Sequence, residues 1–304
     1  MADVAQPAIR PAPLAADEPA PVTAARGYWA SVLRRVRRDR TTMGCLTVLV
    51  AIVLSAILAP WISPADPYDT SMMDRLKPIG TPGYPLGADE LGRDMLSRLL
   101  HGGRLSLFMG ILPVVNALII GGALGLLAGY VGGALNMTIM RVVDVFYAFP
   151  SVLLAIAISG ALGAGLLNAI VSLTVVFTPP LVRVAESVTT QVRTADYVEA
   201  ARASGAGTVT VIRVHVLPNV LGPIFIYATG LISVSIILAS GLSFLGLGVV
   251  PPEPEWGLML NTLRQSIYVS PWVAALPGVM IFATSLAFNL FSDGLRQAMD
   301  VKAQ

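Results

Sequence analysis

Residues 199–218 read EAARASGAGTVTVIRVHVLP, and this polar stretch lies between two long apolar segments. Its alanines favour a helix and leave a small surface that another protein can approach closely. Glu199 lies near the expected start of that helix, where a carboxylate complements the helix dipole. Gly205 permits a backbone turn that other residues resist. Pro218 cannot continue a helix without a kink, so it marks the return of the chain to an apolar span.

The composition indicates a membrane protein. Of the 304 residues, 55% are hydrophobic and only 12% are charged, whereas a soluble domain has about 25% charged residues. A chain this apolar cannot cover itself with polar surface, so it must lie in lipid. The formal net charge of +2 is too small to indicate nucleic acid as a partner. The single cysteine, Cys45, excludes an internal disulfide, and two distant histidines argue against a histidine-based metal centre.

Six segments are long and apolar enough to cross a bilayer, whose hydrocarbon core of about 30 Å requires about 20 residues per helix. The third carries Arg141 and Asp144 near its start, and the fourth is broken by Pro179 and Pro180. We therefore expect an all-α, polytopic membrane protein with six transmembrane helices. The expected spans are 43–63, 105–131, 138–160, 167–190, 221–248 and 272–294.

The distribution of Lys and Arg predicts the orientation of these helices. With the N-terminus inside, fourteen of the 20 basic residues fall in inner segments and six in outer segments. Both termini and the 195–218 loop are then expected to be cytoplasmic. The outer six are Arg75, Lys77, Arg93, Arg98, Arg104 and Arg264.

The segments outside the spans differ in composition. Residues 1–27 are rich in Ala and Pro without apolar periodicity, which predicts a disordered tail. Residues 28–42 place apolar side chains at helical spacing with arginines largely on the other side. This predicts a short amphipathic helix on an anionic inner leaflet, with plain topogenic charge as the alternative. A long outer loop at 64–104 then separates the first span, 43–63, from a five-helix core at 105–304.

Three glycines, Gly121, Gly125 and Gly129, recur every fourth residue and share one face of the second helix. Small residues at this spacing let two helix backbones approach closely, so we expect packing within the protein or against a partner. They are not a phosphate loop, because no Lys-Ser/Thr follows them. No Walker A sequence occurs in the chain, so it does not bind ATP in that way itself.

The 199–218 stretch resembles the EAA loop of ABC importer permeases, where such a permease docks onto its ATPase. That pattern is EAA, three residues, Gly, nine residues and Ile-x-Leu-Pro. One departure is visible, because His215 stands where the general pattern has Ile. The residues that match the motif are Glu199, Ala200, Ala201, Gly205, Leu217 and Pro218.

Other signatures resemble permeases of the dipeptide/oligopeptide/nickel importer family. LGADELGRD at 86–94 precedes the second span, and SFLGLG at 243–248 is followed by EWG at 255–257. FNL at 288–290 leads into DGLR at 293–296. Together with the EAA-like loop they cover the chain except its Ala/Pro-rich tail. Their order is that of the C-type permease.

The resemblance implies the type I permease fold of ABC importers, in a multi-pass protein of the bacterial inner membrane. It implies a transport subunit rather than an enzyme, with no catalytic, cofactor-binding or metal site of its own. The implied partners are a second permease, of the B-type, two ABC ATPase subunits that bind ATP and Mg²⁺, an extracytoplasmic solute-binding protein and membrane lipid. The implied cargo is di- or oligopeptides, with nickel chelates, glutathione-like peptides and oligosaccharides as alternatives. The residues that bind cargo stay unknown.

Several charged and aromatic residues have more than one interpretation. Arg141 and Asp144 are three apart on a helix and can pair; a static pair is the default and a gating role the alternative. The charged residues of 89–98 indicate a hydrogen-bonded structural turn rather than catalysis, and they are a candidate contact for the binding protein. Aromatic side chains near 146–149 could line a peptide path, although lipid or helix packing is the commoner role.

Two rival classes are disfavoured. A secondary transporter needs buried acids or paired broken helices near the midplane, and the predicted bilayer centres carry almost no ionisable residue. An intramembrane enzyme needs a metal motif or a Ser/His pair within a span, and the sequence contains neither.

Overall fold

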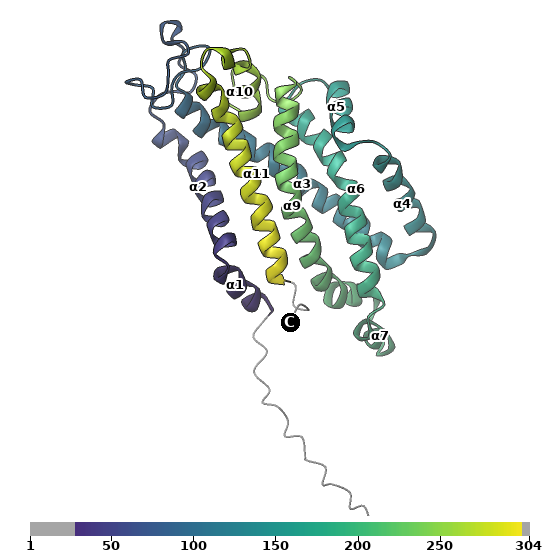
Figure 1. Cartoon of the computed structure of the whole chain (residues 1–304). Helices are drawn as coiled ribbons and strands as arrows, with labels where there is room; N and C mark the ends of the chain where they lie inside the picture. Colours follow the sequence, from purple (N-terminus) through teal and green to yellow (C-terminus); the bar gives the residue numbers. More distant parts are fainter. Residues whose placement is uncertain (1–27, 300–304) are drawn as a thin grey trace, which may run out of the picture.

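The computed structural model describes residues 28–299, so the tail predicted at 1–27 lies outside the described residues. Within that range the long elements are all helices, and Figure 1 shows them running from one end of the molecule to the other. Short helix α10 (Trp256–Leu263) lies at one end and α7 (Asp196–Ala203) at the opposite end. We refer to these as the α10 end and the α7 end.

The membrane-spanning helices agree with the predicted all-α, polytopic fold. Within residues 28–299, five helical segments are long and apolar enough to cross a membrane. A sixth span is formed if the bent pair α4 (Gly133–Tyr147) and α5 (Ser151–Leu162) is counted as one, its two helices meeting at 88°. The five are α2 (Arg40–Ile62), α3 (Met95–Val131), α6 (Leu166–Arg193), Thr208–Phe244, which contains α9 (Leu217–Phe244), and α11 (Pro271–Met299).

The fifth predicted span, 221–248, is part of a helical segment that runs from Thr208 to Phe244. Two other predicted spans differ from the structure for identifiable reasons. Helix α3 begins at Met95 rather than at residue 105, because the Asp94 carboxylate caps it by accepting a hydrogen bond from the backbone N–H of Ser97 at 2.8 Å. The third span is not one straight helix over 138–160. Pro150 disfavours helical backbone in the residue before it, and the chain turns there between α4 and α5.

The glycine row of α3 is where two helix backbones meet most closely. Helix α3 packs most extensively on α6. A Cβ atom built on Gly125 would lie 2.5 Å from the Cβ of Ala185 and 2.5 Å from the backbone oxygen of Val182, both on α6. Gly121 and Gly129 likewise face α6 backbone atoms, at 2.8 and 2.7 Å from a built Cβ. The row therefore packs within the chain, and any side chain larger than hydrogen would push α3 and α6 apart.

Helix α1 (Tyr28–Arg38) packs at the α7 end of the bundle. Val32 and Val36 are buried in a small cluster with residues of α9 and α11. The side chains of Arg34, Arg37 and Arg38 are exposed. Helix α2 follows at once, capped by Asp39, whose carboxylate accepts from the backbone N–H groups at positions 41 and 42.

Candidate functional site

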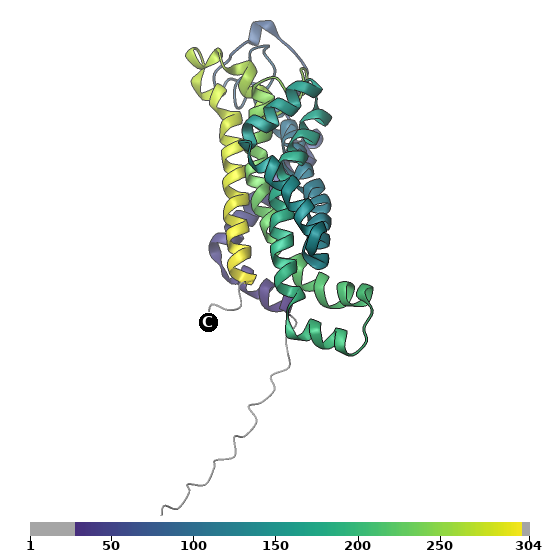
Figure 2. The ribbon, with the colours of Figure 1, turned by 90° about the vertical axis from the view of Figure 1, so that its right-hand side faces the viewer.

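The loop between α6 and α9 projects beyond the bundle at the α7 end. Figure 2 shows α7 and the start of the next helix extending to one side. This segment contains α8 (Thr208–Thr210) and the π-helical η2 (Val211–Val216), which continue directly into α9. Val198, Val211 and Val216 are fully buried, at 0% exposure. These three side chains anchor a loop whose other residues are mostly exposed.

Gly205 closes α7 with a Schellman motif. Its N–H donates to the carbonyl of Arg202 at 2.9 Å, and the N–H of Ala206 donates to the carbonyl of Ala201 at 3.1 Å. This geometry requires the left-handed backbone of Gly205, whose φ is +84°. No atom lies within 4 Å of a Cβ built there. Conformation rather than lack of space therefore demands glycine at this position.

The proline of the motif does not break the helix. Pro218 lies in the first turn of α9, where its missing N–H matters least. The six residues before α9, Val211–Val216, are π-helical, which shifts the hydrogen-bond register ahead of the proline. Leu217 is half-buried and Pro218 is exposed. The chain thus returns to the bundle as one continuous helical segment, Thr208–Phe244, whose start extends to one side of the bundle (Figure 2).

The EAA residues lie on α7 itself. Glu199 and Ala200 are exposed and Ala201 is half-buried. Both acidic residues of α7, Asp196 and Glu199, lie in its N-terminal half, where carboxylates complement the helix dipole. Together they form an exposed acidic helix start at the tip of the α7 end.

One side chain ties the far end of α7 to the bundle. The Arg202 guanidinium lies over the ring of Tyr130 at 5.4 Å from the ring centroid. Tyr130 belongs to the last turn of α3, and its carbonyl also accepts from Arg193 Nη1 at 2.9 Å. Arg202 of α7 and Arg193 of α6 therefore both contact Tyr130 of α3.

Three exposed apolar side chains on this loop were not predicted from the sequence. Tyr197 is 44% exposed, Val209 68% and Val214 58%. Exposed apolar side chains on a projecting loop are available for contact with another protein. In the sequence they are large apolar residues within a polar segment, and this pattern could have identified them independently of the motif.

The charged residues of 89–98 form a buried network at the α10 end. Asp89 Oδ2 lies 2.6 Å from Arg93 Nε and 3.2 Å from Arg98 Nε, and each of these three side chains is at most 5% exposed. Asp89 Oδ1 accepts from the backbone N–H groups of Leu91 and Arg93, each at 2.9 Å. Arg98 Nη1 donates to the carbonyl of Pro67 at 2.9 Å. The network is therefore a structural turn whose charged groups are buried.

Glu255 is a second buried acid at this end, with 0% exposure. Its carboxylate caps α10 by accepting from the N–H groups of Gly257 and Leu258 at 2.9 and 2.8 Å, and from Ser106 Oγ on α3 at 2.9 Å. Burial raises the pKa of the Glu255 carboxyl, and these hydrogen bonds oppose the rise. Glu255 therefore joins the 249–263 segment to α3.

The expected pair between Arg141 and Asp144 is wrong. Asp144 Oδ1 accepts from Arg183 Nη2 on α6 at 2.6 Å. The guanidinium of Arg183 also lies over the ring of Tyr147, 4.3 Å from its centroid. The partner lies on another helix because α4 packs against α6, which the i,i+3 rule does not consider.

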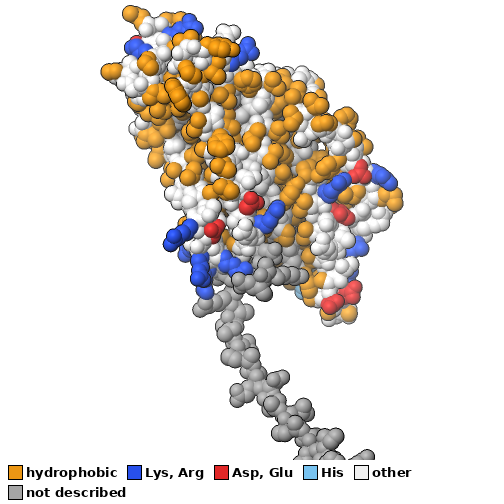
Figure 3. Space-filling model, viewed as in Figure 1, with side chains coloured by type: hydrophobic (Ala, Val, Ile, Leu, Met, Phe, Trp, Pro, Cys, Tyr) orange, Lys and Arg blue, Asp and Glu red, His pale blue; other side chains and the backbone are white. Residues whose placement is uncertain are grey.

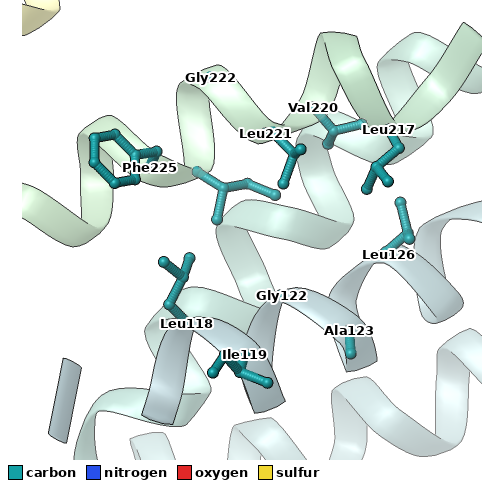
Figure 4. A pocket seen from close by; sticks show the side chains of 11 residues that line it. Leu118, Ile119, Gly122, Ala123, Leu126, Leu217, Val220, Leu221, Gly222 and Phe225 are labelled. Carbon is teal, nitrogen blue, oxygen red and sulfur yellow. The ribbon is translucent and has the colours of Figure 1, made fainter. Parts of the chain in front are cut away.

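An open apolar groove of about 670 Å³ lies between α3 and α9. Figure 4 shows Leu118, Ile119, Leu217 and Phe225 converging on it. Its lining residues are all apolar. A zwitterionic peptide would lose its hydration there without a compensating hydrogen bond, so the groove suits an apolar neighbour within the membrane rather than a peptide.

Comparison with known proteins identifies the chain. Residues 121–303 match the family described as binding-protein-dependent transport system inner membrane component, and residues 27–78 match the N-terminal TM domain of oligopeptide transport permease C. The chain is 43% identical over 280 residues to the di/tripeptide transport system permease protein DppC of Pseudomonas aeruginosa. The alignment covers 90% of this chain and 91% of that protein. This chain belongs to the ABC importer permeases.

Further relatives agree. The permease is 40% identical over 277 residues to the glutathione transport system permease protein GsiD of Pectobacterium atrosepticum, covering 91% and 92% of the two chains. It is 38% identical over 274 residues to the dipeptide transport system permease protein DppC of Alkalihalophilus pseudofirmus, covering 90% of each. It is thus a multi-pass inner-membrane transport subunit rather than an enzyme, from a family that works with an ATPase and a solute-binding protein.

A solved structure supports the fold. The permease aligns with a chain of the inward-facing MetNI methionine ABC transporter at a TM-score of 0.56 and 22% identity, covering 67% of this chain and 97% of that one. The type I permease fold expected from the sequence is therefore confirmed.

Proposed function

We propose that this permease is the C-type membrane subunit of an ATP-driven importer of short peptides. The support is that relatives at 38–43% identity over nine-tenths of the chain carry di/tripeptide, dipeptide and glutathione transport names. All three cargoes are two or three residues long, so short peptides are favoured over nickel chelates and oligosaccharides. The cargo would cross the membrane alongside α4 and α6, where Asp144 and Arg183 are exposed together with Tyr147.

The complete importer would contain four kinds of chain. A B-type permease would lie beside this one, two ATPase subunits beneath the α7 end would bind ATP and Mg²⁺, and a binding protein would dock at the α10 end. The exposed side chains of Tyr197, Val209 and Val214 support ATPase docking at the projecting loop, together with the acids at the start of α7. ATP must bind one conformation better than the other to drive the cycle.

The proposed function also implies an orientation of the permease in the membrane. The excess of basic residues in the segments at the α7 end supports an orientation in which that end and both termini lie in the cytoplasm. Helix α1 would then lie along the inner leaflet, with Val32 and Val36 against the bundle and arginines at the lipid headgroups. Single cysteines at Lys77 and Val209, in a Cys45→Ser background, test this in intact spheroplasts. An impermeant thiol reagent should label position 77 only, and labelling of 209 alone would reverse the orientation.

Two observations together support this function: the chain belongs to the permease family, and its 196–218 loop is exposed. The test is reconstitution in proteoliposomes. The permease alone should neither hydrolyse ATP nor move a labelled dipeptide under a proton or sodium gradient. Addition of the partner permease, ATPases and binding protein should give ATP-dependent dipeptide uptake. Gradient-driven uptake by the lone chain would instead favour a secondary transporter.

A further inference from the structure

The ion pair between Asp144 and Arg183 lies at a depth where charge is costly. Arg183 lies ten residues before the end of α6 at Arg193, which is about 15 Å along the helix. Asp144 lies eleven residues after the start of α4 at Gly133, which is about 17 Å along that helix. Both measures place the pair well inside the span rather than at its end. Ionisable groups at such depth face protein or water rather than lipid.

The pair is nevertheless open to its surroundings. The two side chains are 46% and 48% exposed in this chain. Within residues 28–299, the only hydrogen bond from the Arg183 guanidinium goes from Nη2 to Asp144 Oδ1. A guanidinium has five N–H donors and a carboxylate can accept several hydrogen bonds, so most of their capacity is unused. The buried Asp89 carboxylate shows the opposite arrangement, because it accepts from two backbone N–H groups and from Arg93 and also pairs with Arg98.

The broken backbone around the pair is an independent argument for protein or water, rather than lipid, on this face. The α4–α5 span is broken and bent by 88° near Pro150. Helix α6 carries Pro179 and Pro180 opposite the break, and both line the same small pocket as Tyr147 and Phe149. Irregular backbone at membrane depth is tolerated only against protein or a water-filled cavity. Figure 3 shows acidic and basic side chains together on an otherwise largely apolar flank over α4 and α6.

We propose that Asp144 and Arg183 face the translocation pathway and contact the two charged ends of a peptide in transit. Arg183 would bind the peptide carboxylate and Asp144 its ammonium group, so one protein ion pair is exchanged for two protein–peptide pairs with no change in net charge. Tyr147, 47% exposed and stacked on Arg183, would hold the guanidinium in position. This inference rests on the proposed function, and the site would be completed by the facing permease.

The test measures which peptide terminus each residue recognises. The complete importer is reconstituted, and uptake is driven by saturating binding protein loaded with a free, an N-acetylated or a C-amidated dipeptide. In Arg183→Gln the preference for the free over the amidated peptide should fall about tenfold, while the preference over the acetylated peptide is kept. Asp144→Asn should show the reverse. Arg141→Gln, a loss of charge on the same helix that leaves the pair intact, should change neither ratio.

The alternatives give different results. Equal changes in both ratios, or no change in either, would mean that the pair only joins α4 to α6 or packs on the second permease, and would overturn the proposal. Absence of dipeptide uptake by the wild-type importer would instead refute the proposed function. If Arg183→Gln does not assemble, a benzophenone dipeptide can be photolysed in the wild-type importer. Cross-links at 144–147 or 179–183 that free dipeptide competes away are expected, and cross-links confined to other helices would overturn the proposal.

Discussion

The two ends of this permease use charged residues in opposite ways. At the α10 end, Asp89, Arg93 and Arg98 are buried and bonded to one another and to backbone groups. At the α7 end, Asp196 and Glu199 are exposed, and three valines hold the loop in place. Buried, satisfied charges rigidify a structure, whereas exposed charges beside apolar side chains are available to a partner. The α10 end therefore has the features of a fixed platform, and the α7 end has those that the proposed docking lever requires.

Neutralising Asp89 should cause the largest loss of stability. In Asp89→Asn two buried guanidinium groups lose their shared carboxylate, and breaking a buried pair costs about 3–5 kcal/mol. Thermal unfolding of the purified chain in detergent measures the effect. The matched control is Asp69→Asn, an exposed acid of the same loop with no side-chain partner among the described residues, which should unfold like the wild type. Equal stability of the two variants would remove the distinction between the ends.

The close contact of α3 and α6, which joins the two ends, should be next in size. In Gly125→Ala the new methyl group meets Ala185 and the backbone of Val182 at 2.5 Å, and overpacking of this kind costs about 1–3 kcal/mol. Gly122→Ala is the control, because nothing lies within 4 Å of its Cβ. Thermal unfolding should separate the two variants, and a Gly125→Ala protein as stable as the control would show that α3 and α6 can separate freely.

The buried Glu255 should make the α10 end sensitive to pH. Because its pKa is raised in the folded state, the native protein binds more protons than the unfolded chain above the unfolded pKa. Stability should therefore fall as pH rises from about 4.5 through the folded pKa, by up to about 1.4 kcal/mol per pH unit. Thermal unfolding of Glu255→Gln at pH 5 and 7 should lack this component. A wild-type protein that gains stability relative to the variant over this rise would contradict the assignment.

Sequence patterns predicted those features that depend on neighbours along the chain. The glycine row and the conformation of Gly205 follow from local spacing and backbone sterics, and both are found in the structure. Hydropathy averaged over a span missed the polar first turns of α3, which exist because Asp94 caps them. The partner of Asp144 could not be predicted, because Arg183 is 39 residues away and the contact depends on how α4 packs on α6.

Gly205 tests most directly whether energy enters through the α7 end. Gly205→Ala forces a side chain into left-handed backbone, which costs only about 1–2 kcal/mol. This is the smallest loss of stability expected from the substitutions considered, apart from their controls. Gly207→Ala is matched, since Gly207 also has no atom within 4 Å of a built Cβ but has an ordinary φ of −66°. In the reconstituted importer, dipeptide transported per ATP hydrolysed should fall at least fivefold in Gly205→Ala and stay at the wild-type value in Gly207→Ala. Unchanged coupling in both, with normal assembly, would contradict the claim that α7 is the lever through which ATP drives transport.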